Sequence, residues 1–397
     1  MIYIRIIIKN IIYLTLAGIR LFIRQENIII IGGPNSHRYG GNIKYLYEFL
    51  IENSDYDVFW LTESADIKKH LNSKGYKYLS NEKYFDKIYA TLKCKFVIDS
   101  GTNFYNPFFL ISRSKKVIKI STMHGSGPKL TLGDNKKSQQ KILNKFNCVS
   151  FCTDHAKSKI GGSEFALSDG IARVLGQPKH DLLKDKHYVN SIYNKRKWCS
   201  EILQKNDVTE DTIIYYCPTW RKSLSYLPIE QIKNFNFKQF NSFLKTNNIY
   251  FLYTLHMMST LKNHHHEYSN IKYVNLKNYP LFDNLELLME SDIMITDYST
   301  LSTDYAILEK PQLFVVPDFE DMKSKKGFIE DPVNLMPGMI VTHYIELCDY
   351  IIKYSIDNNE YKKDYYKELK NLKEKYLAND LVKSREMFLD YISSHKI

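Results

Sequence analysis

Short apolar runs alternate with helix-compatible segments along this chain, and the alternation occurs in two series. The first series reads as buried strands at residues 27–31, 57–61, 96–98, 117–120, 149–151 and 172–175. The second series follows at residues 212–217, 250–253, 272–274, 293–295 and 312–316. Because strands that alternate with helices form parallel, doubly wound sheets, we expect an α/β fold with two such sheets.

The 397 residues suffice for two domains of ordinary size, each with its own core. We therefore predict a Rossmann-like N-terminal domain over residues 26–205 and a Rossmann-like C-terminal domain over residues 206–397, with the charged stretch 184–205 connecting them. Residues 1–25 are assigned to a separate, amphipathic segment. Two α/β domains in one chain indicate that a ligand binds in a cleft between them.

The N-terminal segment is strongly apolar but carries four basic residues, Arg5, Lys9, Arg20 and Arg24. On a helix these four side chains project within an arc of roughly 100°. The longest uncharged run is shorter than the ~20 residues that span a bilayer, and no signal-peptide cleavage site follows. Two interpretations stay open. The segment is either an amphipathic helix in the plane of an anionic membrane surface or a helix packed on the core.

The net charge of +11 and the pI of about 9.0 favour a polyanionic partner, such as nucleic acid, an anionic membrane surface or an anionic polymer. The chain has no recognisable nucleic-acid motif with interleaved aromatic residues, so we expect no nucleic-acid partner. The six cysteines form no CxxC pair, which predicts structural thiols in a reducing compartment. Three adjacent histidines at positions 264–266 cannot all face one metal ion on a helix or strand, so we predict no metal site.

The clearest candidate site lies at residues 291–300. An apolar strand at 293–295 ends in Thr296, Asp297 and Tyr298, and the hydroxyl residues Ser299 and Thr300 open an apparent helix at 301–308. Main-chain N–H groups at such a helix start are free to bind an anion. In an open α/β sheet, ligands bind at this end of the strands. The motif predicts a phosphate-bearing ligand, with Asp297 fixing the turn or capping the helix.

A second candidate is the glycine-rich turn at residues 121–129, which follows the strand 117–120. Glycine lets the main chain approach a ligand closely. Histidine is the side chain best suited to accept a proton near neutral pH, so His124 is a candidate general base. Lys129 supplies a positive charge for a phosphate group. The alternative is that His124 only caps the local main chain.

Two further strand ends carry a functional candidate each. Arg221 ends the run 216–221 and can bind phosphate through two parallel hydrogen bonds, although a strand-end arginine also commonly forms a surface ion pair. His256 follows the strand 250–253, and its alternative is a structural histidine. The glycine-rich run 32–41 has neither the GxGxxG nor the P-loop pattern, so we expect no dinucleotide or kinase-type site there.

Taken in order, these motifs resemble the CDP-glycerol glycerophosphotransferase family, which comprises teichoic acid and capsule polymerases and primases. The resemblance covers residues 32–338. Its elements are Met123-His124-Gly125 with Lys129, the run 176–181 that ends in Asp181, Pro-Thr-Trp-Arg at 218–221, His256, the run 295–300, Asp304, Pro317-Asp318, the Lys-Gly-Phe of 326–328, and Pro337-Gly338. The sequence departs from the family at Met123, where tryptophan is usual, and at Leu255 and Met257 beside His256. Both departures are expected to alter a substrate pocket.

The resemblance implies a GT-B fold, in which two Rossmann-like domains face each other across a cleft. It also implies a reaction in which an acceptor hydroxyl attacks the distal phosphorus of CDP-glycerol, CDP-ribitol or a related CDP-alditol, and CMP leaves. The acceptor would be a lipid-linked or capsular polymer, which places the protein peripherally on the cytoplasmic face of the cell membrane. The alternatives are a nucleotide-sugar glycosyltransferase of the same fold and a non-catalytic polyanion-binding protein.

The resemblance also suggests a role for each candidate residue. His124 and His256 would be catalytic, with His124 as the base. Phosphate binding would fall to Lys129, Arg221, Thr296, Asp297, Ser299 and Thr300, and supporting roles to Gly125, Asp181 and Asp304. The chain has no DxD-like motif where a metal would be needed, so we expect neither a metal nor another cofactor. The identity of the alditol stays open.

Overall fold

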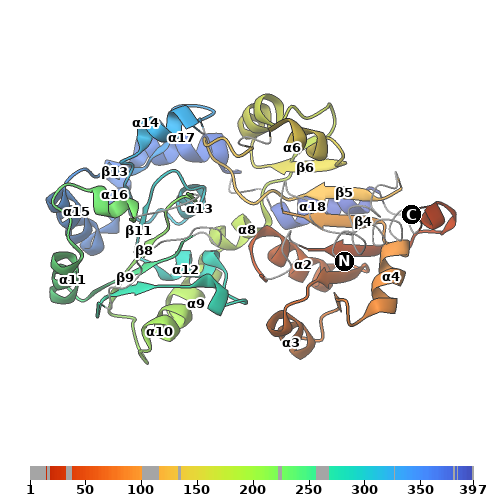
Figure 1. Cartoon of the computed structure of the whole chain (residues 1–397), viewed down its shortest axis with the longest axis horizontal. Helices are drawn as coiled ribbons and strands as arrows, with labels where there is room; N and C mark the ends of the chain where they lie inside the picture. The colour runs from red at the N-terminus through yellow and green to blue at the C-terminus, as the bar shows by residue number, and fades with distance from the viewer. Residues whose placement is uncertain are drawn as a thin grey trace, which may run out of the picture.

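The structure of the chain is a computed structural model, which describes residues 15, 18–32, 38–100, 116–132, 136–221, 226–255, 268–325, 327–378, 381 and 383–395. Two parallel sheets lie side by side, with helices on their faces and one short helix, α8, between them (Figure 1). The predicted α/β fold with two doubly wound sheets is confirmed. No helix in the described ranges is long and apolar enough to cross a membrane.

The first sheet has seven parallel strands in the order β3-β2-β1-β4-β5-β6-β7. The strands are β1 (Ile28–Ile31), β2 (Asp57–Leu61), β3 (Tyr78–Leu79), β4 (Phe96–Asp99), β5 (Ile118–Ser121), β6 (Cys148–Phe151) and β7 (Ala172–Val174). Helices connect them, namely α2 (Gly41–Asn53), α3 (Ala65–Ser73), α4 (Tyr84–Lys93), α6 (Lys136–Leu143), α7 (Asp154–Ala156) and the π-helix η3 (Lys157–Glu164). Strand β1 is four buried isoleucines, as expected for a parallel strand covered on both faces.

The second sheet has six parallel strands in the order β10-β9-β8-β11-β12-β13. The strands are β8 (Thr212–Tyr216), β9 (Ile249–Tyr253), β10 (Ile271–Tyr273), β11 (Ile293–Thr296), β12 (Gln312–Phe314) and β13 (Gly338–Ile340). Its helices include α11 (Phe237–Thr246), α12 (Asn284–Glu290), α13 (Leu301–Tyr305), α14 (Phe319–Lys325), α15 (Tyr344–Ile356), α16 (Asn358–Asp364) and α17 (Tyr366–Tyr376). The strand order reverses between β1 and β4 in the first sheet and between β8 and β11 in the second, which are the positions where such sheets bind ligands.

The chain passes between the two sheets more than once. After α8 (Pro178–Lys184), the helices α9 (Lys186–Tyr193) and α10 (Lys197–Leu203) pack on the second sheet, where Cys199 and Leu203 join the core around Tyr215. The last helix, α18 (Ser384–Ser393), returns to the first sheet, where Phe388 and Ile392 are buried. The division of the chain at residue 205 does not include this return and stays a prediction.

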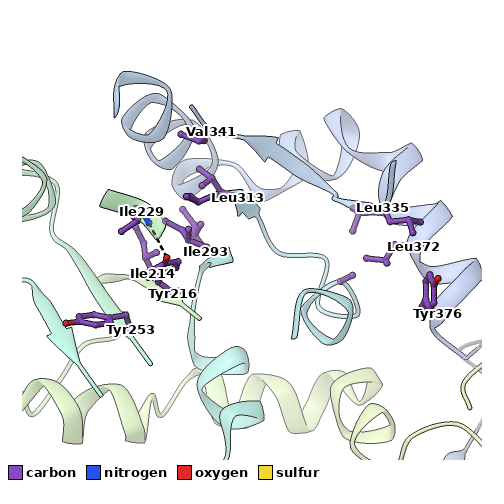
Figure 2. Packing of buried hydrophobic residues seen from close by; sticks show 14 of the residues in the cluster. Ile214, Tyr216, Ile229, Tyr253, Ile293, Leu313, Leu335, Val341, Leu372 and Tyr376 are labelled. Carbon is purple, nitrogen blue, oxygen red and sulfur yellow. Dashed lines mark hydrogen bonds between the residues drawn. The ribbon is translucent and has the colours of Figure 1, made fainter. Parts of the chain in front are cut away.

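The largest apolar cluster covers the second sheet and the helices beside it, and it continues into the first half at α6, β6 and η3. Figure 2 shows it extending from Ile214 and Ile293 in the sheet to Leu372 and Tyr376 on α17. Tyr216 reaches across it and accepts a hydrogen bond from the main-chain N–H of Ile229 at 3.3 Å (Figure 2). All six cysteines are buried and free of disulfide bonds, as the sequence predicted.

Only the end of the N-terminal segment is described. The short helix η1 (Arg20–Phe22) contacts the first half because the buried Arg20 guanidinium donates hydrogen bonds to the carbonyl groups of Thr91 and Cys94. Arg20 therefore packs against the domain, and it is not on an exposed basic face together with Arg24. Arg5 and Lys9 lie outside the described residues, so the amphipathic helix stays a prediction.

Candidate functional site

The two strand ends at the centre of the second sheet meet at its topological switch point. Thr296, the last residue of β11, donates its hydroxyl hydrogen to the carbonyl of Cys217 at 2.8 Å. Asp297 Oδ1 accepts hydrogen bonds from the N–H of Thr219 at 2.8 Å and from its own neighbour Tyr298 at 2.6 Å. As the sequence analysis expected, Asp297 fixes the turn, and Thr296 joins the same buried network.

Arg221 is held by two carboxylates in this turn. Its Nη1 donates to Asp297 Oδ2 at 2.7 Å, and its Nε and Nη2 donate to Asp318 at 2.8 and 3.0 Å. Burial alone would lower the pKa of Arg221, but the two carboxylates raise it well above its usual value. Arg221 thus forms a largely buried ion pair rather than a surface one, and this pair orders the turn where a phosphate was predicted. Phosphate binding by Arg221 stays a prediction.

The turn at Ser299 and Thr300 opens a helix that is shorter than predicted. Helix α13 ends at Tyr305 rather than near residue 308 because the next residues form tighter turns, such as Leu308 N–H to Tyr305 O at 2.9 Å. Ser299 Oγ accepts a hydrogen bond from Leu301 N at 3.3 Å. In the described part of the chain, the N–H groups of Ser299 and Thr300 themselves have no hydrogen-bond acceptor.

His124 follows β5 on a turn whose main chain is constrained. Met123 adopts a left-handed conformation with φ of 54°, which costs an L-residue roughly 1–2 kcal/mol. Its carbonyl accepts a hydrogen bond from Asn42 Nδ2 at 2.7 Å, and the carbonyl of His124 accepts one from Lys179 Nζ at 3.2 Å. Met123 is buried whereas the His124 side chain is exposed, so the turn presents His124 at the surface.

The His124 turn packs directly on the Thr300 turn of the other sheet. A methyl group placed on Gly125 would lie 2.5 Å from Thr300 Oγ1, and one on Gly127 would lie 3.4 Å from Thr303 Oγ1. A side chain at Gly125 would therefore push the two turns apart, whereas a methyl group at Gly127 would only just fit. The structure therefore brings together the two candidate elements, His124 and the hydroxyl turn, although they come from different sheets.

Asp304 lies at the centre of the contact between the two halves. It forms an ion pair with Lys179 Nζ at 2.5 Å and a hydrogen bond with His180 Nε2 at 2.8 Å. Burial raises the pKa of Asp304, but Lys179 and His180 outweigh burial and leave it below its usual value. Burial lowers the pKa of His180 despite the neighbouring carboxylate. Sequence analysis did not identify Lys179 or His180, although both lie in the 176–181 motif.

Of the remaining predicted site residues, Asp181 lies elsewhere, whereas Lys129 lies near the 297–300 turn. Asp181 accepts hydrogen bonds from the N–H groups of Ser384 and Arg385, both at 2.8 Å, so it anchors the N-terminus of α18. Lys129 forms a short antiparallel bridge with Phe328, whose ring packs on that of Tyr298 with 5.3 Å between the centroids. His256 lies outside the described residues. Within the described ranges, no three His, Cys, Asp or Glu side chains are grouped to hold a metal ion.

The N-terminus of α2 contacts a carboxylate of the second half. Gly41 N–H donates to Asp283 Oδ2 at 2.8 Å, while Asp283 Oδ1 accepts from Leu285 N at 3.0 Å and caps α12. In dinucleotide-binding folds this first helix faces a phosphate group. Here the carboxylate of Asp283 binds the N-terminus of α2 in place of a phosphate group. This agrees with the lack of a GxGxxG pattern before the helix.

Comparison with known proteins places this arrangement in a family. The family model described as CDP-Glycerol:Poly(glycerophosphate) glycerophosphotransferase matches residues 16–393. The teichoic acid ribitol-phosphate polymerase TarL of Staphylococcus aureus is 24% identical over 358 residues, which are 86% of this chain but 58% of that protein. The teichoic acid poly(glycerol phosphate) polymerase of Bacillus spizizenii is 24% identical, and 87% of each chain is covered. This chain thus spans less than two thirds of the length of some relatives, namely 58% of TarL and 64% of TarK.

The same fold occurs in solved structures. The wall teichoic acid polymerase TagF superposes with a TM-score of 0.73 at 18% identity, covering 98% of this chain and 95% of that chain. A UDP complex of S. aureus MnaA superposes with a TM-score of 0.53 at 13% identity, covering 93% and 96%. The TagF likeness confirms the predicted GT-B-like pair of doubly wound halves. Because the family model matches nearly the whole described fold, the chain belongs to the CDP-glycerol:poly(glycerophosphate) glycerophosphotransferase family.

Proposed function

We propose that this protein transfers an alditol phosphate from a CDP-alditol to a hydroxyl group of a polymer acceptor and releases CMP. The observation that carries the proposal is the contact between Gly125 and Thr300, which joins the turn of the candidate base to the predicted phosphate-binding turn. The family and its relatives, which are named as glycerol-phosphate and ribitol-phosphate polymerases, support the same reaction class.

In the proposed reaction, His124 accepts the proton of the acceptor hydroxyl. The hydroxyl oxygen then forms a bond to the distal phosphorus of the donor, and the bond between that phosphorus and the oxygen of CMP breaks. The N–H groups of Ser299 and Thr300 would bind phosphoryl oxygens, because they have no acceptor within the described chain. Arg221 would contribute by holding this turn in one conformation through its hydrogen bond to Asp297. No step requires a metal ion.

The test is release of CMP from CDP-glycerol and CDP-ribitol in parallel, with membranes of the source cell as acceptor. We expect one donor to release CMP and His124→Ala to lower the rate on the order of 100-fold or more. His187→Ala is the matched control, because His187 is exposed on α9, away from this turn. A folded His124→Ala protein with normal CMP release would refute the base role.

The same assay separates the proposal from its nearest alternative. A nucleotide-sugar glycosyltransferase would release a nucleoside diphosphate from a nucleotide sugar and no CMP from either CDP-alditol. Tight, salt-sensitive binding to a polyanion without turnover of either donor would instead indicate a binding protein. The donor that is used identifies the alditol, and the length of the product separates addition of one unit from polymerisation.

We further propose that the protein associates peripherally with the cytoplasmic face of the membrane through the first half. Large exposed aromatic side chains gather at η1 and α4, where Phe22 and Phe85 are 92% and 84% exposed and Tyr84 and Tyr89 are about half exposed. The hydrogen bonds of Arg20 attach η1 to the end of α4, and both elements lie away from the second sheet (Figure 1). Aromatic side chains are favoured at the boundary between water and lipid.

Flotation with lipid vesicles tests this second proposal. Replacing Phe22 and Phe85 by serine should reduce binding to vesicles that contain anionic lipid, because less apolar surface enters the interface. Ile356→Ser is the matched control, since Ile356 is 81% exposed at the far end of α15. Equal binding of all variants would show that another surface makes the contact.

A further inference from the structure

Four buried polar side chains lie between the two sheets and have no role in the proposed chemistry. They are Asn42 on α2, Lys179 and His180 on α8, and Asp304 on α13, with exposed fractions of 1%, 5%, 0% and 1%. We call them the buried polar cluster. Buried polar groups are costly unless they are paired, and these four are hydrogen-bonded to one another or to the main chain.

One end of the cluster holds the main chain on both sides of His124. Asn42 Nδ2 donates to the carbonyl of Met123 at 2.7 Å, and its Oδ1 accepts the N–H of Lys179 at 3.2 Å. Lys179 Nζ donates to the carbonyl of His124 at 3.2 Å. The two carbonyl groups that flank the Cα atom of His124 are therefore fixed, and the left-handed residue Met123 immediately precedes His124.

The other end of the cluster is joined to the hydroxyl turn. Lys179 Nζ also contacts Asp304 Oδ2 at 2.5 Å. The N–H of Asp304 donates to the carbonyl of Thr300 at 3.4 Å, and Thr300 packs on Gly125. These contacts form a closed ring, because Gly125 is the next residue after His124. The ring crosses between the first and second halves twice, at the ammonium group of Lys179 and at the contact between Gly125 and Thr300.

A buried ion pair at this position is not by itself evidence that the pair stabilises the fold. Replacing a buried ion pair by apolar residues of similar volume is often neutral for stability, whereas its geometry can specify one arrangement. We propose that Lys179 is a positioning residue, whose ammonium group holds the His124 turn of the first sheet against the 297–300 turn of the second. This inference rests on the proposed function, in which His124 is the base and the 297–300 turn binds the donor phosphate.

The decisive comparison is among Lys179→Met, Lys179→Arg and Lys44→Met. Methionine keeps the length of the side chain and removes its hydrogen bonds, whereas arginine restores donors. Lys44 is the matched control, because it is 8% exposed and forms an ion pair between the halves, with Glu286 at 3.0 Å, without contacting the His124 turn. Each variant is first shown to be folded by its thermal transition.

We expect Lys179→Met to lower kcat for CMP release on the order of 100-fold, as for a catalytic group displaced by about 1 Å, with KM for the donor changed less than about threefold. Lys179→Arg should recover most of kcat, and Lys44→Met should leave it near the wild-type value. A raised KM for the donor in Lys179→Met with unchanged kcat would overturn the proposal. Equal losses of kcat in Lys179→Met and Lys44→Met would overturn it too.

Amide hydrogen exchange gives a readout that does not depend on turnover. Exchange in residues 122–130 should become faster in Lys179→Met and not in Lys44→Met, because Lys179 donates a hydrogen bond to that turn and Lys44 does not. If Lys179→Met does not fold, Asp304→Asn replaces it, since it removes the charge that orients Lys179. Wild-type protein that releases no CMP would refute the proposed function alone. Unchanged exchange in the variant would refute the positioning role.

Discussion

Gly125 lies so close to Thr300 that a β-carbon on the glycine would sit 2.8 Å from the β-carbon of the threonine. These two residues belong to different sheets, and each follows the end of a strand that its own sheet places near the centre. The candidate base and the candidate phosphate turn can therefore lie this close only because residue 125 is a glycine, which has no β-carbon.

Gly125→Ala is expected to destabilise the protein by about 1–3 kcal/mol, because the β-branched Thr300 cannot move away without shifting α13. It should also lower CMP release more than its effect on stability explains, since the two turns separate. Combining it with Thr300→Gly should recover part of the stability. Gly162→Ala is the control, because nothing lies within 4 Å of its added methyl group. Urea unfolding of wild type, the two single variants, the double variant and Gly162→Ala measures the effects, and additive losses would contradict the steric explanation.

The ion pair of Arg221 gives a second prediction. Arg221→Gln leaves Asp297, which is 2% exposed, with an uncompensated buried charge, and is expected to cost about 3 kcal/mol. The double variant with Asp297→Asn should be more stable than Arg221→Gln alone, because no charge is then left unpaired. Arg173→Gln, at an exposed residue of β7, should change stability by less than about 0.5 kcal/mol. If the double variant were less stable than Arg221→Gln, the unpaired charge of Asp297 would not be the cause of the loss.

Asp283 supplies a third prediction, because one carboxylate caps two helices that belong to different halves. Asp283→Ala is expected to cost about 2 kcal/mol, the sum of two caps at about 1 kcal/mol each. Asp357→Ala, which removes a cap from α16 alone, should cost about half as much. Equal shifts of the thermal transition in the two variants would show that the contact with Gly41 contributes nothing.

The strands that carry the candidate site were predictable because their signal is local. A buried strand such as β11 is a short apolar run, and the hydroxyl residues after it mark the turn. The edge strands β3 and β13 were missed, because β3 has only two residues and β13 begins with a glycine and exposes Met339. The return of α18 to the first sheet was missed for another reason: its apolar residues Phe388 and Ile392 do not show on which core they pack.

The motifs located several charged residues of the site, but they did not predict the partners of those residues. Arg221 and Asp181 occur in motifs that suggest ligand binding, yet they form ion pairs or helix caps within the chain. Lys179 meets Asp304 across 125 residues of sequence, and no periodicity connects positions so far apart. Such contacts follow from how the two sheets pack on each other, which is information that the local pattern of residues does not contain.

Glu330 joins the two halves at a further contact. Its carboxylate contacts His155 Nε2 of the first half at 2.8 Å, the Tyr376 hydroxyl on α17 at 2.6 Å and the ammonium group of Lys375. Burial raises the pKa of Glu330, but Lys375, Tyr376 and His155 together lower it to about 2. These contacts therefore stabilise the folded protein when Glu330 is ionised.

The sign of the pH dependence follows from that lowered pKa. The stabilisation is fully present above the unfolded pKa of about 4.5, and it is lost as the pH falls through the folded value of about 2. Glu330→Gln should therefore have a lower thermal transition than wild type at pH 6, with a difference that shrinks as the pH is lowered towards 2. Glu374→Gln, at a side chain that is 66% exposed, should follow the wild-type curve throughout. If the Glu330→Gln difference stayed constant from pH 6 to the lowest pH at which the proteins fold, the contacts would depend on shape and hydrogen bonding rather than on the charge of Glu330.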